Sequence, residues 1–388
     1  MHIYPDSRAE PEFHRKRQMA LVGFRRYKNQ VHPCLVIMGR ASNEIVNSWR
    51  RITEHIYPRD ELTGMAAEVS VVISTYNRCS LLARALESLR HQESVDVCYE
   101  VLVVDNNSTD ETREITQRVI GEDPEKFRYI FEPKQGVSYG RNAGIASAHA
   151  EIIAFTDDDV RVSSSWVSRI KAGFAAEPSA DFLGGKVLPH WSGIPPAWLT
   201  PAHWAPLALL DYGDQPFYVD AGRQLCLVGA NCAFRRRAFE QVGLFRADFQ
   251  RVKNGVGSLE DHELLLRLWR AGRKGIYLPD LTVTAEVEPN RLRKTYHREW
   301  HTGHGRFHAM LRSELLERSK LGKILGVPAH LYRRALSDAV QWTISQLLGQ
   351  RDKAFGYEVR MRFFAGFVGR RWHEFLHSQS SPDSAADE

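Results

Sequence analysis

Apolar and polar blocks alternate along residues 68–155, and a polar loop follows each apolar block. Four short runs rich in Val, Ile and aromatic residues have the length and composition of buried strands. They are residues 69–74, 100–104, 128–131 and 152–155. Between the runs, leucines and alanines recur at helical spacing, as at Leu82, Leu86 and Leu89. Strands alternating with helices predict an α/β fold with a doubly wound, mostly parallel sheet.

The pattern changes on either side of this segment. Residues 180–230 show no regular period, and a helix is predicted from residue 258. From residue 291 onward the chain reads as amphipathic helices, chiefly 324–348 and 360–375. The expected organisation has four parts. They are an N-terminal extension at 1–66, an α/β domain at 67–290, a basic helical region at 291–377 and a disordered tail at 378–388.

Three consecutive aspartates, Asp157, Asp158 and Asp159, come directly after the last predicted strand. They cannot all be buried unpaired, because an isolated buried charge is strongly unfavourable and like charges repel. A hard divalent ion, Mg²⁺ or Mn²⁺, prefers carboxylate oxygens and leaves coordination positions for phosphate. The alternative is an acidic turn that pairs with Arg or Lys at the surface.

Polar residues in other loops supply matching chemistry. The ring of Tyr76 can stack on a nucleobase, and Asp105 can accept a hydrogen bond from a base N–H. The planar guanidinium of Arg141 suits a phosphate. Asp261 lies at a predicted helix start, where a carboxylate can deprotonate an acceptor hydroxyl. Loops after parallel strands lie at one edge of the sheet. The polar residues of these loops together predict a site for a nucleoside diphosphate that carries a leaving group.

Six segments resemble, in order and spacing, the motifs of family 2 glycosyltransferases of the GT-A fold. They are residues 71–78 (VVISTYNR), 103–110 (VVDNNSTD), 136–144 (GVSYGRNAG), 155–159 (FTDDD), 229–231 (GAN) and 260–261 (ED). The resemblance covers residues 68–290 and, more loosely, the helical region. It implies an inverting, metal-dependent transfer of a sugar from a nucleotide sugar, most usually a UDP-sugar, to a hydroxyl of a glycan or lipid-linked acceptor.

The resemblance also implies roles for individual residues. Asp261 is the expected catalytic base, with Glu260 beside it. Asp157 and Asp159 are expected to hold Mg²⁺ or Mn²⁺. The expected nucleotide-sugar ligands are Ser74, Thr75, Tyr76, Asn77, Arg78, Asp105, Asn107, Arg141, Asp157 and Asp158.

Some positions leave alternatives open. Many relatives carry a metal-binding His where this chain has Ala285. Glu286, a histidine from the next segment, or diphosphate and water would then complete the metal shell. Asn231 and Trp198 are candidates for contact with the acceptor or donor sugar, with helix capping and core packing as the respective alternatives. The histidines at helical spacing favour a partly exposed polar face over a metal site. They are His297, His301, His304 and His308.

Charge is distributed unevenly. Residues 291–377 hold 17 Lys and Arg against 7 Asp and Glu, a local excess of +10, while the whole chain is +5. This excess, beside apolar residues of 347–375, predicts peripheral contact with an anionic membrane, with internal packing or dimerisation as the alternative. Five scattered cysteines and a charged N-terminus without an apolar core predict a reduced, cytoplasmic protein.

Two other function classes remain open from the sequence. A sugar-phosphate nucleotidyltransferase has a similar fold, but such enzymes usually carry a Gly-rich phosphate loop after the first strand, and residues 74–77 are not such a loop. A non-catalytic protein that binds anions or membranes is supported only by the basic region. No nucleic-acid-binding motif is present, and the sugar, the acceptor and the oligomeric state are not encoded in recognisable motifs.

Overall fold

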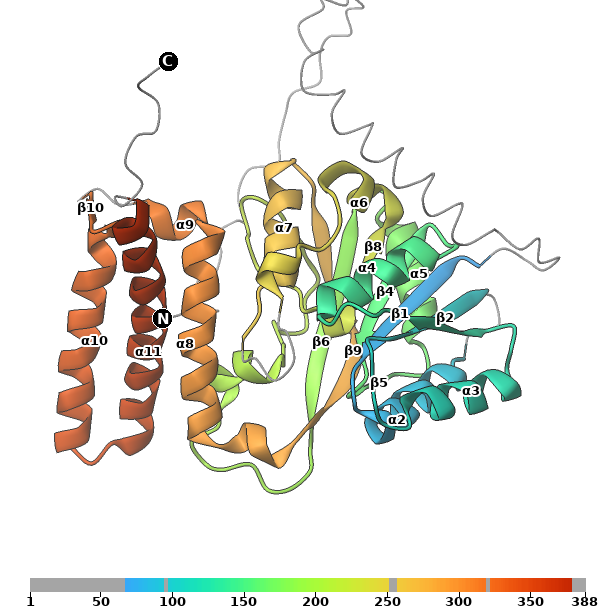
Figure 1. The fold of residues 1–388 in the computed structure, drawn as a ribbon, viewed down its shortest axis with the longest axis horizontal. Coiled ribbons are helices and arrows are strands. Elements are labelled where there is room, and N and C mark those ends of the chain that lie inside the picture. Colours follow the sequence, from blue (N-terminus) through green and yellow to red (C-terminus); the bar gives the residue numbers. More distant parts are fainter. Residues whose placement is uncertain (1–66, 94–96, 251–256, 319–321, 379–388) are drawn as a thin grey trace, which may run out of the picture. The chain divides into compact units, whose positions relative to one another are not determined.

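A nine-stranded mixed sheet is the central element of the fold (Figure 1). The computed structural model describes residues 67–93, 97–250, 257–318 and 322–378. The expected extension at 1–66 lies outside the described residues, as does the expected tail except for Ser378. The strand order is β3-β2-β1-β4-β8-β6-β9-β5, and β7 pairs with β9. The strands are β1 (Val69–Thr75), β2 (Tyr99–Asp105), β3 (Phe127–Phe131), β4 (Ile152–Asp157), β5 (Val160–Val162), β6 (Phe182–Trp191), β7 (Phe217–Val219), β8 (Cys232–Arg235) and β9 (Gly275–Val287).

Helices pack around this sheet. The larger ones in the first part of the chain are α2 (Cys79–Arg90), α3 (Thr112–Glu122), α4 (Val137–Ser147), α5 (Trp166–Ala176), α6 (Arg236–Val242) and α7 (Glu260–Arg270). Short 3-10 turns occur at η1 (Pro201–His203), η2 (Ala205–Leu207), η3 (Gly229–Asn231), η4 (Ala247–Phe249) and η5 (Pro289–Leu292). The last part contains α8 (Lys294–Leu311), α9 (Glu314–Glu317), the small hairpin β10 (Lys323–Ile324) and β11 (Val327–Pro328), α10 (Ala329–Leu347) and α11 (Arg351–Ser378).

The parallel half of the sheet creates the crevice for a ligand. Strands β3, β2, β1 and β4 pair in parallel, and their apolar residues are buried as predicted. The chain order runs outward from β1 to β3 and then returns to β4 on the other side of β1. Right-handed crossovers therefore place α2 and α3 on one face and α4 on the other, as Figure 1 shows. The order reverses between β1 and β4, and open α/β sheets bind ligands at the carboxyl ends of strands at such a point.

The other half of the sheet was not predicted in full. Residues 180–230 contain β6, a ten-residue strand that pairs in parallel with β9 and antiparallel with β8. The register of β6 shifts between Gly185 and Lys186. A Cβ at Gly185 would lie 1.8 Å from the Leu281 carbonyl oxygen, so only glycine permits this close approach. Two adjacent glycines are unfavourable in most strands, so the local sequence did not indicate strand β6.

Helices α8 and α11 pack so closely that their backbones touch. A Cβ at Gly305 would lie 2.0 Å from the Phe363 carbonyl oxygen, and a Cβ at Gly366 would lie 1.9 Å from the Thr302 carbonyl oxygen. The rings of Phe363 and Phe367 are buried in this region. These two phenylalanines belong to the apolar cluster that we predicted for membrane contact, and they pack internally instead. No helix among the described residues is long and apolar enough to cross a membrane.

The histidines of α8 are more buried than expected. His297, His304 and His308 are less than 10% exposed, and Nε2 of His304 lies 3.1 Å from Nε2 of His308. Burial lowers the pKa of His297 to about 4, so this side chain is neutral at pH 7. The prediction of a partly exposed polar face therefore holds only for His301, because aromatic residues cover the other rings, as Phe363 covers those of His304 and His308.

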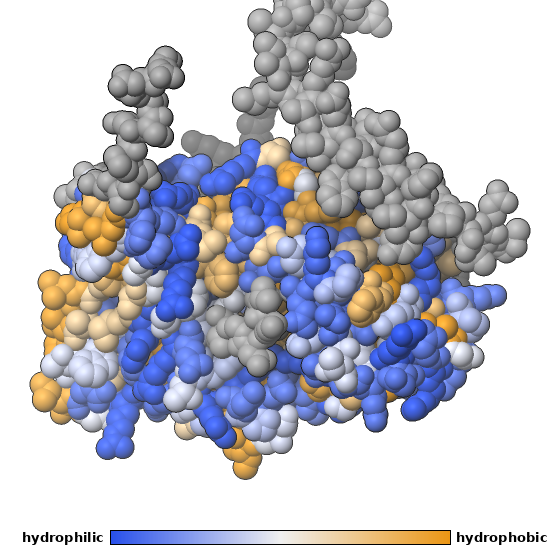
Figure 2. All heavy atoms as spheres, viewed as in Figure 1, coloured by the Kyte–Doolittle hydropathy of each residue, from blue (hydrophilic) through white to orange (hydrophobic). Residues whose placement is uncertain are grey.

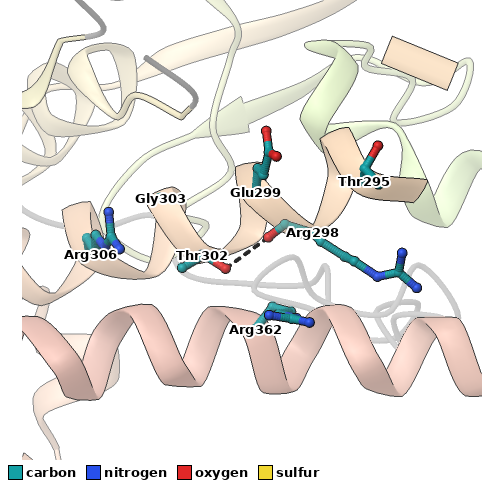
Figure 3. A pocket seen from close by; sticks show the side chains of 7 residues that line it. All are labelled: Thr295, Arg298, Glu299, Thr302, Gly303, Arg306 and Arg362. Atoms are coloured by element: carbon teal, nitrogen blue, oxygen red, sulfur yellow. Dashed lines mark hydrogen bonds between the residues drawn. The ribbon is translucent and has the colours of Figure 1, made fainter. Parts of the chain in front are cut away.

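A groove of about 440 Å³ lies between α8 and α11 (Figure 3). Its lining residues are Thr295, Arg298, Glu299, Thr302, Gly303, Arg306 and Arg362. Arg298 donates two hydrogen bonds to Glu358, at 2.6 and 3.0 Å. Figure 3 shows Glu299 and Arg298 projecting to opposite sides of α8, so the charged groups do not converge on one point. The groove is therefore a polar gap between two helices and offers no focused binding site.

We predict that a side chain at Gly366 destabilises the protein. Gly366→Leu must displace a helix, because the added Cβ would overlap the Thr302 carbonyl, and overpacking typically costs about 1–3 kcal/mol. Thermal unfolding followed by circular dichroism should show a lower melting temperature. The matched control is Gly369→Ala on the same helix, where no atom lies within 4 Å of the added Cβ. Equal melting temperatures for both variants would contradict this helix packing.

Candidate active site

Charged side chains gather at the carboxyl ends of β1 and β4, and at the start of α7. They come from five segments that are distant in sequence: the loop after β1, helix α4, the turn after β4, the start of α7 and the segment after β9. Six carboxylates meet three guanidiniums there. The carboxylates are those of Asp157, Asp158, Asp159, Glu260, Asp261 and Glu288, and the guanidiniums are those of Arg78, Arg141 and Arg291.

Arg78 holds one side of the aspartate triplet. Its Nη1 donates to Asp158 Oδ1 at 3.1 Å and to Asp159 Oδ2 at 3.0 Å, and its Nη2 donates to Glu288 Oε2 at 3.1 Å. Nη2 of Arg291 lies 3.5 Å from Asp159 Oδ2. These contacts match the alternative from the sequence, an acidic turn that pairs with arginine. The arginines, however, are partly buried within the cluster and do not lie freely at the surface.

Arg141 binds the other side of the aspartate triplet, at Asp157. Its side chain is only 5% exposed, and its Nη1 donates to Asp261 Oδ1 at 2.6 Å and to Glu260 Oε1 at 3.2 Å. Its Nη2 donates to Asp157 Oδ1 at 3.4 Å. One guanidinium thus joins the aspartate triplet to the predicted base. We expected Arg141 to pair with phosphate, and here it binds the three carboxylates.

The backbone also fixes Asp261. The N–H of Gly229 donates to Asp261 Oδ2 at 2.9 Å, so each oxygen of this carboxylate has a partner. A Cβ at Gly229 would lie 2.5 Å from Arg141 Nη2 and 2.6 Å from Asp261 Oδ1. Glycine at position 229 is therefore required by the close approach of the ion pair to the chain. The Asp261 side chain keeps 21% exposure, which leaves it reachable from solvent.

Burial shifts two acid pKa values upward. Burial and the charge of Asp261 together raise the pKa of Glu260 to about 7, and the charge of Arg141 limits this rise. Burial likewise raises the pKa of Asp158 to about 6. The charge of Arg78 lowers this pKa, and repulsion from Asp159 raises it. Both pKa shifts have the same cause, an excess of carboxylates in a site with little access to water.

The residues fit a hard divalent cation in donor type and in charge. With every group ionised, the six carboxylates and three guanidiniums carry a formal net charge of −3. Carboxylate oxygens are the ligands that Mg²⁺ and Mn²⁺ prefer. Across the part of the chain that the structure describes, no three His, Cys, Asp or Glu side chains form a ready metal site. The arginines occupy the carboxylate oxygens, so the cluster is not arranged as a preformed metal shell.

The end of β9 and the segment after it bear on the question raised by Ala285. Ala285 is buried on β9 opposite Val160. The Glu286 N–H donates to the Asp159 carbonyl oxygen at 2.8 Å, while the Glu286 side chain accepts hydrogen bonds from Arg161 Nη2 at 2.7 Å and from Ser192 Oγ at 3.1 Å. The acid that shares Arg78 with the triplet is Glu288. Glu286 stays one of the three alternatives for the metal shell, and its side chain would have to leave Arg161 to serve there.

The loops after β1 and β2 form a wall of the site beside the charged cluster. Thr75 Oγ1 donates to Asp158 Oδ2 at 2.8 Å, and Asn77 Oδ1 accepts from the Thr109 N–H at 2.7 Å, which ties the two loops together. Asp105 is buried and accepts hydrogen bonds from Tyr129 Oη at 2.7 Å and from the Ser108 N–H at 2.8 Å. Three further expected nucleotide ligands are at least partly exposed in this wall. They are Ser74, Tyr76 and Asn107.

The two candidate sugar contacts, Asn231 and Trp198, make contacts within the chain. Asn231 is fully buried, accepts a hydrogen bond from Trp166 Nε1 at 2.8 Å and donates to two backbone carbonyl oxygens. Trp198 makes edge contacts with the rings of His297 and Phe355, at centroid distances of 4.9 and 5.0 Å. Asn231 thus ties η3 to β6 and β9 and is shielded from a sugar. Trp198 packs against α8 and α11 but keeps part of its surface exposed, so its contact with a sugar stays a prediction.

Sequence reasoning missed three residues of this site: Gly229 as a backbone donor, Glu288 and Arg291. The motif around Gly229 was visible, but its contact with Asp261 depends on the fold. No sequence signal marks Glu288 or Arg291, because they lie about 130 residues after the triplet and reach it only when β9 pairs with β5.

Comparison with known proteins identifies the family. Residues 70–243 match the model of the family described as Glycosyl transferase family 2. This segment is therefore a family 2 glycosyltransferase domain. The expected fold is confirmed, and the matched segment includes the triplet, Arg141 and Gly229.

Named relatives resemble only part of this glycosyltransferase. Validoxylamine A glucosyltransferase of Streptomyces hygroscopicus is 34% identical over 136 residues, which is 34% of this chain and 30% of the relative. The GalNAc(5)-diNAcBac-PP-undecaprenol beta-1,3-glucosyltransferase of Campylobacter jejuni is 32% identical over 105 residues, or 26% of this chain and 33% of the relative. The chain thus spans about a third or less of the length of these relatives.

A solved structure supports the fold. Mannosyltransferase PcManGT from Pyrobaculum calidifontis, in complex with GDP-Man and Mn²⁺, has a TM-score of 0.55 and 18% identity to this glycosyltransferase. The similarity covers 86% of this chain and 96% of that chain. At this identity the similarity establishes the GT-A fold alone.

We predict that Glu260 makes stability depend on pH. Its pKa is raised from 4.5 to about 7, so the native state keeps a proton that the unfolded chain loses, and stability falls as pH rises through this window. Glu260→Gln removes the effect. The melting temperature of the variant minus that of the wild type should therefore increase from pH 4.5 to about 7 and then stay constant. Glu240→Gln, at an exposed position, should give a difference independent of pH. The same flat profile for Glu260→Gln would show that the Glu260 proton is not retained.

Proposed function

We propose that this protein transfers a sugar from a nucleotide sugar, with a UDP-sugar as the first candidate, to a hydroxyl group of a glycan or lipid-linked acceptor, with inversion at the anomeric carbon. The observation that carries the proposal is the bridge through Arg141 between Asp157 and Asp261. It places a solvent-reachable carboxylate beside the aspartate triplet, at the point of the sheet where ligands bind. Family membership and the names of the relatives support the same reaction class.

The donor would bind in the wall formed by the loops after β1 and β2. Tyr76 and Asn107 are accessible there, and Asp105 lies at the carboxyl end of β2. Each oxygen of Asp105 accepts one hydrogen bond within the chain and retains a second lone pair for a base N–H. Arg78 and Arg291 lie at the mouth of the triplet, where each can exchange a carboxylate partner for a phosphate oxygen.

Asp261 would act as the general base. The acceptor oxygen attacks the anomeric carbon, the bond from that carbon to the diphosphate breaks, and the diphosphate leaves with the electron pair. The hydroxyl proton passes to the Asp261 carboxylate. Arg141 and the Gly229 N–H orient this carboxylate.

Asp157 and Asp159 would hold Mg²⁺ or Mn²⁺, with Asp158 completing the acidic turn. A divalent ion there would offset the charge that develops on the departing diphosphate. The surplus of three negative charges in the cluster supports this assignment, because a diphosphate adds more negative charge to the same place.

We place the enzyme in the reducing cytoplasm, where the thiols of Cys79, Cys226 and Cys232 would remain free. A nucleotidyltransferase, the alternative from the sequence, is less well supported. The loop after β1 presents Asn77 and Arg78 to neighbouring side chains and has no Gly-rich phosphate cradle.

We predict that Asp261→Asn abolishes transfer and preserves nucleotide binding. An amide cannot accept the hydroxyl proton, and loss of a general base typically costs about 10²–10⁴-fold in rate. Release of nucleoside diphosphate from a panel of UDP- and GDP-sugars, with glycan and lipid-linked acceptors, measures the rate. Asp280→Asn, on an exposed side chain of β9, is the matched control. Turnover at the wild-type rate in Asp261→Asn would exclude Asp261 as the base.

We predict that Asp159→Ala removes the dependence of nucleotide binding on metal. Calorimetry with UDP and with GDP should show tighter binding in Mn²⁺ for the wild type and no Mn²⁺ effect for the variant. Glu286→Ala is the matched control, because the Glu286 side chain binds Arg161 and Ser192 and makes no hydrogen bond to a triplet carboxylate. An unchanged Mn²⁺ effect in Asp159→Ala would remove this residue from the metal site.

A further inference from the structure

Helix α10 exposes a continuous row of apolar side chains. The exposed fractions are 68% for Leu336, 50% for Val340, 43% for Ile344, 82% for Leu347 and 64% for Leu348. Figure 1 places α10 at the edge of the helical region, and Figure 2 shows hydrophobic atoms along that edge. Single exposed leucines are common on protein surfaces, but five on one helix form a patch that calls for a partner.

These residues lie on the side of α10 that points away from the rest of the protein. The buried residues of the helix are Leu331, Asp338 and Ser345, which recur every seven residues and face α11. At 100° per residue, Val340 is directly opposite this buried face. Helix α10 therefore has two stripes, and only one of them is covered within the described residues. We name the uncovered one, made of the five residues given above, the outer stripe.

The charges around the outer stripe argue against a lipid surface. Between Arg334 and Arg351 the only charged residue is Asp338, which is buried and accepts from Arg360 at 2.8 Å. A helix that lies on a membrane normally carries Lys and Arg along its polar face. Three of the arginines that we expected to contact lipid are already paired with carboxylates. They are Arg360 with Asp338, Arg370 with Glu374 and Arg371 with Glu317.

The outer stripe is instead complementary to itself. A twofold axis perpendicular to α10 at position 342 exchanges Leu336 with Leu348 and Val340 with Ile344. Both of these exchanges place an apolar residue against an apolar residue, while Leu347 is exchanged with the exposed Ser337. The charged residues lie only beyond the two ends, so the centre of such a contact contains no buried charge.

We propose that the outer stripe binds a second copy of this chain, with the two α10 helices antiparallel. In this dimer Leu336 contacts Leu348 of the partner subunit, and Val340 contacts Ile344 of the partner subunit. The contact uses the face opposite α11, so it leaves the catalytic cluster of each copy unchanged. The proposal does not depend on the proposed function.

Sedimentation equilibrium of the full chain, without lipid, tests the proposal. We expect a dimer for the wild type. Ile344→Glu places a charge in the apolar contact and should raise the monomer–dimer dissociation constant at least about tenfold. Gln346→Glu adds the same charge two residues away, at an exposed position outside the stripe, and should leave the dissociation constant unchanged. Circular dichroism should show equal helix content in all three proteins.

Cross-linking tests the antiparallel arrangement. Mixing the Val340→Cys and Ile344→Cys proteins under oxidising conditions should give a disulfide-linked dimer, whereas Val340→Cys alone should give much less. Preferential linkage of Val340→Cys to itself would indicate parallel helices and overturn the proposed arrangement. A wild-type chain that stays monomeric overturns the proposal. If such a monomer floats with anionic vesicles, and Ile344→Glu abolishes flotation, the stripe binds lipid instead.

Discussion

The active-site region depends on one electrostatic constraint, the surplus of carboxylates over guanidiniums at the edge of the sheet. Six acids meet three arginines, and several of these groups are more than nine-tenths buried. Such a cluster is stable only while every acid is paired or protonated, because an unpaired buried charge is strongly unfavourable. The raised pKa values of Glu260 and Asp158 and the shared use of Arg141 are two expressions of this constraint. The same surplus is what a divalent ion and a diphosphate would relieve together.

The topology of the sheet brings these acids together. The return of the chain from β3 to β4 opens the crevice between β1 and β4, and the triplet follows β4 directly. The second half of the chain then contributes α7 with Asp261 and the segment after β9 with Glu288. Arg141 from α4 reaches across the boundary between the halves, so the proposed donor wall and the proposed base share one rigid contact. This arrangement explains why Gly229 has no side chain.

The helical region is an integral part of the fold. Trp198 packs against His297 of α8 and Phe355 of α11, and Gly305 and Gly366 let those helices touch. Phe363 and Phe367 are buried by this packing, and Arg360 and Arg371 form ion pairs within the chain. Trp372 stays exposed, as does the outer stripe of α10. Peripheral membrane contact therefore stays a prediction beside the proposed dimer.

The sequence by itself determined the parallel half of the sheet, the aspartate triplet and the position of Asp261 at a helix start. Each of these rests on local physics: β-branched runs form buried strands, and polar loops after parallel strands meet at one edge. Only the tertiary structure decided which charges pair. The contacts of Arg141 with Asp261, and of Arg78 with Glu288, join residues 120 and 210 positions apart. The burial of Asn231 and the packing of Trp198 against α8 and α11 were equally hidden, because the same side chain serves a core or a ligand according to neighbours that are distant in sequence.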